Sequence, residues 1–165
     1  MMTKLSLSEM KAAMQASQTD FLALLDELSD EQLAQTAPDG WSVGVVMFHM
    51  SEAREHFAGD IETLVASSFA DAVGRTLAHE GRVANIAKAE AKAPSKATLR
   101  TRLEESYQTI MAALTKLSDE ALEHTITNQN PKFGEQPLWD FIGHFVIDHD
   151  CGHVAQAKAV SEGVA

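Results

Sequence analysis

The chain has 165 residues, one cysteine and a formal net charge of −11 at neutral pH. A chain of this length can bury roughly 68–70% of its unfolded surface in one core, so we expect a single domain over residues 1–165. The acidic balance argues against a nucleic-acid partner, because a phosphate backbone requires a surface of Lys and Arg. The sequence shows no secretion signal and no apolar run long enough for a membrane span. A lone cysteine suits a reducing compartment, so we expect a cytoplasmic protein without a membrane partner.

The first two helical segments are predicted from apolar residues that recur at steps of three and four. Ser6 followed by Glu9 matches a capping box at the start of the first segment, whose apolar residues are Leu7, Met10, Met14, Phe21, Leu25 and Leu28. The second segment follows a turn at residues 38–40 and has Ser42 as its N-cap. We expect the preceding Trp41 to close the end of the bundle rather than to contact a substrate. The apolar face of the second segment consists of Val46, Met50, Ala53, Phe57, Ile61 and Leu64.

Two further helical segments follow after a long connection. One begins near Ser95, and its inward face consists of Leu99, Leu103, Ser106, Ile110, Ala113 and Leu117. The last begins at Pro137, a residue favoured in the first turn of a helix. Its predicted inward face consists of Leu138, Ile142, Phe145, His149, Gly152 or His153, Gln156 and Val160. Because no useful stretch alternates with period two, the sequence predicts an all-α protein.

The lengths of the connections predict the topology. Residues 69–94 form a link much longer than a helix–helix turn needs, and we expect a short helix at residues 82–92 within it. Such a link can run back along the bundle, which would make the second and third helices parallel. The links near residues 30–41 and 121–136 can join antiparallel neighbours. We therefore predict a four-helix bundle with one long crossover between helices 2 and 3.

Histidines interrupt the apolar faces of two of these helices. His149 and His153 are four residues apart, so they lie one turn apart on nearly the same side of a helix. Both imidazoles can then reach a single point, as a transition-metal ion requires of its ligands. His49 points inward from the second helix. The alternative is a set of core histidines that form hydrogen bonds to neighbouring carboxylates or carbonyls, and the residues alone leave both interpretations open.

Two blocks of the sequence resemble the DinB-like (YfiT-related) family of four-helix bundles. In the first block, WSVGVVMFHMSEAREHF, His49 follows Trp41 by eight residues; the second block, LWDFIGHFVIDHDCGHVAQ, contains a His-x-x-x-His-x-x-Gln pattern. The resemblance implies a divalent metal, typically nickel or zinc, held by His49, His149 and His153. It also implies relatives that are metal-dependent transferases and isomerases, that use low-molecular-weight thiols and that are often dimeric, so we expect a homodimer.

The ligand count indicates which chemistry is open to such a site. Three neutral imidazoles leave at least one coordination position free, as in catalytic rather than structural metal sites. That position can hold a water, whose pKa falls toward roughly 7 on zinc, or a thiolate sulfur. Imidazole suits zinc, nickel, copper and iron alike, so the donor set does not select the metal.

Several neighbouring residues have two interpretations each. Glu52 shares a face with His49 and is a candidate general base, fourth ligand or partner of a ligand; the alternative is a solvated helix carboxylate. Gln156 either forms a hydrogen bond near the site or lies at a bundle end. Asp148 and Asp150 flank His149 and are expected to be exposed, although either could orient an imidazole. Cys151 is expected to be a small buried residue.

Two classes of function fit this sequence. The first is a metal-dependent enzyme, a thiol-dependent transferase or a hydrolase, that acts on a small molecule at an open three-histidine site. The second is a non-catalytic bundle that binds a metal or small ligand, for example in a stress response. A structural dimer, in which the histidines are merely packed in the core, is a third interpretation. An accessible cleft that reaches the histidines favours the enzyme.

Overall fold

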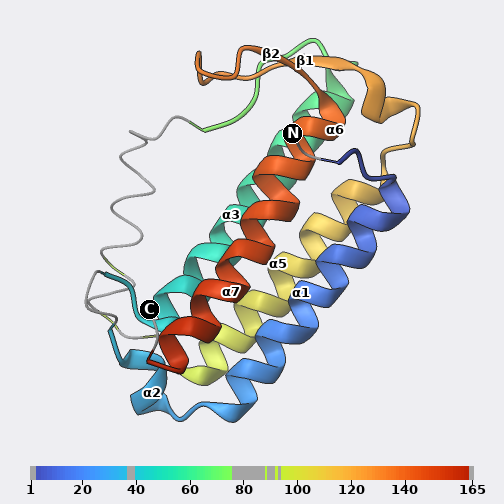
Figure 1. The fold of residues 1–165 in the computed structure, drawn as a ribbon. Helices are drawn as coiled ribbons and strands as arrows, with labels where there is room; N and C mark the ends of the chain where they lie inside the picture. Colours follow the sequence, from blue (N-terminus) through green and yellow to red (C-terminus); the bar gives the residue numbers. More distant parts are fainter. Residues whose placement is uncertain (1–2, 37–39, 76–87, 89–91, 93, 164–165) are drawn as a thin grey trace.

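The computed structural model describes residues 3–36, 40–75, 88, 92 and 94–163, and they form an elongated four-helix bundle (Figure 1). Three of the long helices are single elements, namely α1 (Leu7–Glu27), α3 (Val43–Ala66) and α5 (Lys96–Thr115). The fourth consists of three segments in succession: α6 (Leu138–Ile142), the π-helical segment η2 (Gly143–Asp148) and α7 (His149–Ser161). The predicted helical bundle is confirmed.

Serine residues begin three of the long helices, as the sequence predicts. Ser6 and Glu9 form the expected capping box of α1, and the hydrogen bonds from the backbone and hydroxyl of Ser6 lower the pKa of Glu9. Ser42 and Ser95 cap α3 and α5 through their hydroxyl oxygens. Pro137 lies just before α6 in an extended conformation, instead of in its first turn. The start of the last helix is therefore correct to within one residue.

Helices α3 and α5 run in the same direction, opposite to α1 and α7 (Figure 1). Side-chain pairs between α3 and α5 show the parallel arrangement, because Arg102 Nη2 lies 3.4 Å from Glu55 and Lys116 Nζ lies 2.6 Å from Glu62. Residue numbers therefore increase in the same direction along α3 and α5, as they do in parallel helices. The long crossover and the parallel second and third helices are as predicted.

The connections contain short elements that the sequence analysis missed. The first holds the short helix α2 (Asp30–Ala34), and the third holds the 3₁₀ turn η1 (Ala121–Glu123) and two antiparallel strands, β1 (Thr125–Thr127) and β2 (Glu135–Pro137). Strands of three residues are too short to show period-two alternation. The helix expected at residues 82–92 lies outside the described residues, apart from two isolated positions.

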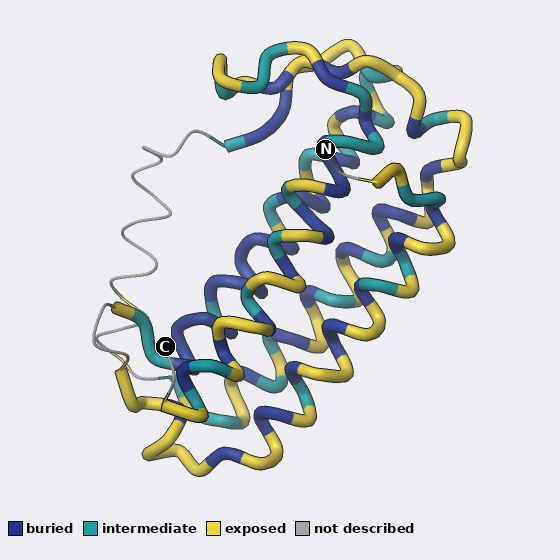
Figure 2. Tube along the Cα trace, viewed as in Figure 1, coloured by how far each residue is buried: buried dark blue, intermediate teal, exposed yellow. Residues whose placement is uncertain are grey.

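Buried apolar side chains form two clusters between the helices. The buried positions recur along each long helix (Figure 2). A layer of buried polar residues separates the clusters, and each long helix contributes to it: Gln18 from α1, Arg54 from α3, Ser106 from α5 and Asp150 from α7. Among the described residues, no helix combines the length and the apolar character that a membrane crossing requires.

Candidate metal centre

Three histidine side chains from two helices meet at one point. His49 Nε2 on α3 lies 3.4 Å from His149 Nε2, and His153 Nε2 lies 3.2 Å from the same atom. One nitrogen from each ring lies within 4.8 Å of the other two. Imidazole nitrogens placed tetrahedrally at about 2.0–2.1 Å from a zinc ion would be about 3.3 Å apart. The spacing and the chemistry of this donor set therefore fit a transition-metal ion.

The two histidines of α7 lie beside its buried face and not on it. The predicted inward face ran through His149, His153 and Gln156, whereas the structure buries Asp150, Val154 and Ala157, each one position later. The π-helical segment η2 explains the shift, because a π turn takes in one more residue than an α turn. One added residue rotates the following helix by about 100°. The imidazoles are thus turned from the middle of the bundle toward α3.

Each of the three imidazoles has a distinct environment. His49 is 2% exposed, whereas His149 and His153 are half-buried. Gln156 is exposed, and its Oε1 lies 2.7 Å from His153 Nδ1. A proton on Nδ1 satisfies this amide oxygen and leaves the Nε2 lone pair directed at the other two histidines, which is the tautomer that a metal ligand needs.

Trp41 lies against this cluster, a contact that the sequence analysis did not anticipate. Its ring centroid is 5.0 Å from that of His49, edge to face, and 6.2 Å from that of His153, stacked with an interplanar angle of 21°. The indole also packs against the apolar cluster at that end of the bundle. Trp41 therefore shields one side of the histidines from water.

Glu52 is buried, so its interpretation as a solvated surface carboxylate is wrong. Its Oε1 lies 3.9 Å from Nη1 of Arg75, a residue of the segment that follows α3. Among the described residues, the group of mutually close ligand atoms comprises the three histidines and does not include Glu52. The carboxylate thus lies on the same helix as His49 but pairs with a cation.

The burial of the two acids and the cysteine beside His149 differs in part from the expectation. Asp148 is exposed as expected, whereas Asp150 is fully buried in an ion pair with Arg54. Cys151 is exposed instead of buried, with its Sγ 3.5 Å from Ser17 Oγ on α1. The burial of Asp150 follows from the one-residue rotation that η2 imposes on α7. The exposure of Cys151 does not, because about 200° of helix separates it from His149, so the predicted inward face already left it outside.

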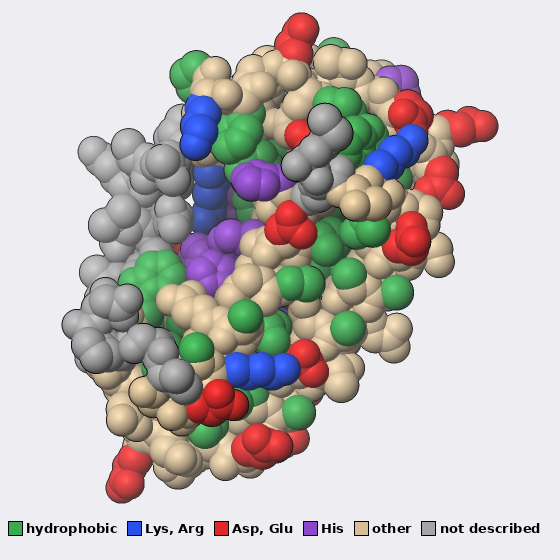
Figure 3. Space-filling model, in the orientation of Figure 1, with side chains coloured by type: hydrophobic (Ala, Val, Ile, Leu, Met, Phe, Trp, Pro, Cys, Tyr) green, Lys and Arg blue, Asp and Glu red, His purple; other side chains and the backbone are tan. Residues whose placement is uncertain are grey.

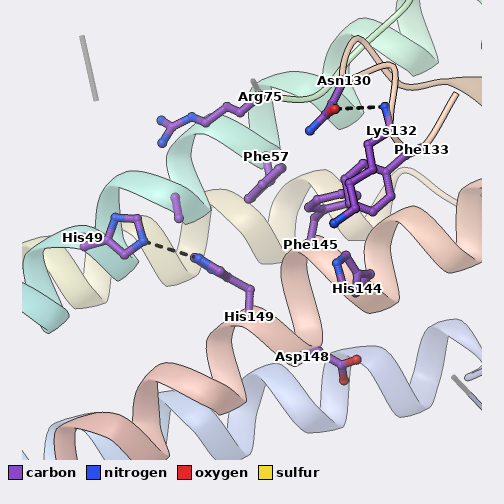
Figure 4. A pocket seen from close by; sticks show the side chains of 11 residues that line it. His49, Phe57, Arg75, Asn130, Lys132, Phe133, His144, Phe145, Asp148 and His149 are labelled. Carbon is purple, nitrogen blue, oxygen red and sulfur yellow. Dashed lines mark hydrogen bonds between the residues drawn. The ribbon is translucent and has the colours of Figure 1, made fainter. Parts of the chain in front are cut away.

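A cavity of about 480 Å3 lies directly beside His49 and His149 (Figure 4). On the surface, the histidine side chains gather in a hollow next to blue cationic groups (Figure 3). The walls combine apolar, polar and charged side chains of both signs, namely Ala53, Phe57, Arg75, Asn130, Lys132, Phe133, His144, Phe145 and Asp148. The histidine cluster is therefore accessible to a small molecule.

Comparison with known protein families shows which family this chain belongs to. The sequence matches the DinB superfamily over residues 13–157. The chain belongs to this superfamily. No curated protein matches the chain, so the DinB assignment depends on the family match and on the fold.

Solved structures with the same DinB fold differ widely in sequence from this chain. A crystal structure of mycothiol-dependent maleylpyruvate isomerase superposes with a TM-score of 0.69 at 15% identity, covering 99% of this chain and 69% of that one. A mutant of that isomerase gives 0.72 at 13% identity, with the same coverage. The colibactin self-resistance protein ClbS, in complex with a double-stranded DNA, gives 0.70 at 14% identity and covers 97% of this chain and 98% of that one. At such identities the likeness shows the fold alone.

The sequence analysis of this DinB protein missed the residues that shape the cavity. Arg75, Asn130, Lys132 and Phe133 all lie in connections between helices. Connections carry no periodic pattern that would place their side chains, and binding residues commonly lie there for that reason.

Proposed function

We propose that this DinB protein is a metal-dependent enzyme that acts on a small molecule, as a transferase that uses a low-molecular-weight thiol. Hydrolysis is the second reaction type compatible with the same site. The observation that carries the proposal is the meeting of three imidazole nitrogens at the edge of a cavity of about 480 Å3. An open site of this kind is typical of catalytic rather than structural metal binding.

His49, His149 and His153 would hold a divalent ion, nickel or zinc. When bound, such an ion supplies Lewis-acid activation of a thiol or a water. Because all three ligands are neutral, they add no negative charge that would weaken this effect. Gln156 fixes the tautomer and the ring orientation of His153 through the contact at 2.7 Å.

Protein groups around the histidines would exclude water and take up protons. Trp41 covers the cluster on one side, and Phe57 forms part of the cavity wall. Glu52 is the candidate proton acceptor, because it is buried and lies one helical turn beyond His49. Its proximity to Arg75, at 3.9 Å, keeps a cation beside the carboxylate.

The alternative is a non-catalytic bundle that binds a metal or small ligand in a stress response. A sealed ion with only protein ligands would favour that alternative, whereas the open cavity supports the enzyme. The expectations that the chain forms a homodimer and binds no nucleic acid stay predictions. The net charge of −11 supports the second one.

Turnover with candidate thiols tests the proposal. Metal-loaded protein would be screened with thiol-transfer and hydrolysis substrates, beside the His49→Ala variant. As a matched control, His56→Ala removes a histidine of the same helix that instead lies 3.4 Å from Asp60. We expect turnover by wild type and by the control but not by His49→Ala. Equal turnover by all three proteins would contradict the proposal.

A further inference from the structure

The cavity beside the histidines is less acidic than the molecule as a whole. The chain carries 24 acidic and 13 basic residues, whereas the charged side chains of the cavity wall are Arg75, which also pairs with the buried Glu52, and the exposed Lys132 and Asp148. We propose that this cavity binds an organic oxyanion, a carboxylate or phosphate joined to a flat apolar body. The proposal rests on the proposed function and names the class of substrate that this site takes.

Backbone hydrogen bonds link the two segments that carry the cations. Val73 N donates to Thr127 O at 3.0 Å, and Gln129 N donates to Val73 O at 2.7 Å. Arg75 follows this junction by two residues on one segment, and Lys132 lies in the loop that continues from the other. The backbone positions of Arg75 and Lys132 relative to each other are therefore set by the fold.

Side-chain contacts hold both segments close together at this junction. Gly74 has a φ of +106°, and a Cβ there would lie only 2.6 Å from Asn128 Oδ1, so the approach requires glycine. Gly74 N also donates to Asp60 Oδ2 on α3 at 3.1 Å. In the other segment, Asn130 Oδ1 accepts from Lys132 N at 3.0 Å. The backbone that carries Arg75 and the exposed Lys132 is thus an ordered junction.

The remaining wall is suited to a flat apolar group. Phe133 and Phe145 pack edge to face with centroids 4.8 Å apart, and Phe57 lies 6.1 Å from Phe145. Lys132 Nζ lies 5.6 Å from the Phe133 ring centroid, so the ammonium borders this aromatic surface. Figure 4 shows Arg75 and Lys132 on the connecting segments and His49 and His149 on the helices.

The cationic and aromatic side chains of the cavity wall together favour one class of ligand. An Arg guanidinium can donate two parallel hydrogen bonds to an oxyanion, and a Lys ammonium acts as a point charge. A molecule held this way has its anionic end at Arg75 or at Lys132, which lie on different sides of Phe57 (Figure 4), and its apolar body on the aromatic wall. Its reactive carbon then lies within the cavity that His49 and His149 border. A neutral or cationic analogue would lose the charge-assisted hydrogen bonds.

Titration calorimetry with matched probes tests the inference. Benzoate and phenyl phosphate offer the two kinds of oxyanion on the same ring, and benzamide is the neutral analogue. Each would be titrated into the full-length protein, both metal-free and metal-loaded. We expect at least one anion to bind about tenfold or more tightly than benzamide, and the stronger of the two identifies the preferred oxyanion.

Variants assign the preference to the two cations. Whichever of Arg75→Gln and Lys132→Gln removes the cation that holds the anion should weaken anion binding by about tenfold and leave benzamide binding unchanged; if that cation is Arg75, Arg75→Lys should recover part of the loss. Lys116→Gln, which removes the same charge from a surface pair with Glu62, should bind as wild type. Circular dichroism of each variant shows whether the fold is intact.

Three results would overturn the inference: benzamide binding as tightly as the anions, wild type binding neither anion, or both glutamine variants binding anions as wild type does. In the third case, with metal-dependent anion binding, the ion itself would be the anion site and the proposed function would stand. Arg75-dependent anion binding by a protein that retains no metal would support the inference and contradict the proposed metal enzyme.

Discussion

Arg54 and Asp150 form a buried ion pair with two hydrogen bonds, which joins α3 to α7 beside the histidine cluster. Arg54 Nε donates to Asp150 Oδ1 at 2.9 Å and Nη2 donates to Oδ2 at 2.8 Å, and each side chain is 1% exposed. Arg54 Nη1 also donates to Gln18 Oε1 on α1 at 2.7 Å. Asp150 directly follows His149, so the ion pair fixes the rotation of the helix that carries two of the three imidazoles.

Asp150→Asn should therefore destabilise the protein strongly. Loss of one partner leaves the Arg54 charge buried without compensation, which typically costs about 3–5 kcal/mol. Urea unfolding followed by circular dichroism measures the change. Asp148→Asn is the matched control, because Asp148 is exposed and its substitution should change stability by less than about 0.5 kcal/mol. Equal unfolding midpoints for the two variants would show that the pair does not hold the bundle together.

His153→Ala should lose tightly bound metal and keep most of its helix content. The side chain is half-buried at the edge of the bundle, so its truncation removes a ligand without opening the core. Elemental analysis of untagged protein, beside circular dichroism, makes this measurement. His56→Ala, whose histidine pairs with Asp60, should retain the metal. Stoichiometric metal in the His153→Ala protein would refute its assignment as a ligand.

Gln156→Ala should weaken metal binding without abolishing it. The amide oxygen orients His153 at 2.7 Å, and loss of a group that orients a ligand typically lowers metal affinity by about 10–100-fold. Competition with a zinc chelator of known affinity gives the ratio. Gln156→Glu keeps an acceptor at this position and should bind zinc at least as tightly as wild type. An unchanged affinity in the alanine variant would mean that the contact does not support the site.

The expected homodimer can be tested in solution. Light scattering at micromolar concentration should give about twice the chain mass of 17.9 kDa. The expectation comes from the resemblance to DinB-like proteins and from the long amphipathic helices. A mass equal to one chain would contradict it.

The architecture was predictable because its signals are local or depend on chain length. Ser6, Ser42 and Ser95 mark helix starts through a side-chain oxygen that accepts from the backbone. The long second connection indicated a crossover, since a short one cannot join parallel helices. His49 was correctly placed facing inward, because α3 is a regular helix to which the period of 3.6 applies.

The errors arise where a regular period fails. No local pattern in the sequence indicates the π-helical segment η2, which begins at Gly143, so Asp150 was assigned to the wrong side of α7. The pairing of Arg54 with Asp150 joins residues 96 positions apart, and no local pattern predicts such a contact. Arg75 and Lys132 line the same cavity because backbone hydrogen bonds link two separate connections.

X-ray absorption spectroscopy of the zinc-loaded protein tests most directly whether three imidazoles share one ion. We predict three imidazole nitrogens at about 2.0–2.1 Å from the zinc, and two in the His49→Ala variant. A shell of oxygen donors that is the same in wild type and in the variant would contradict the account.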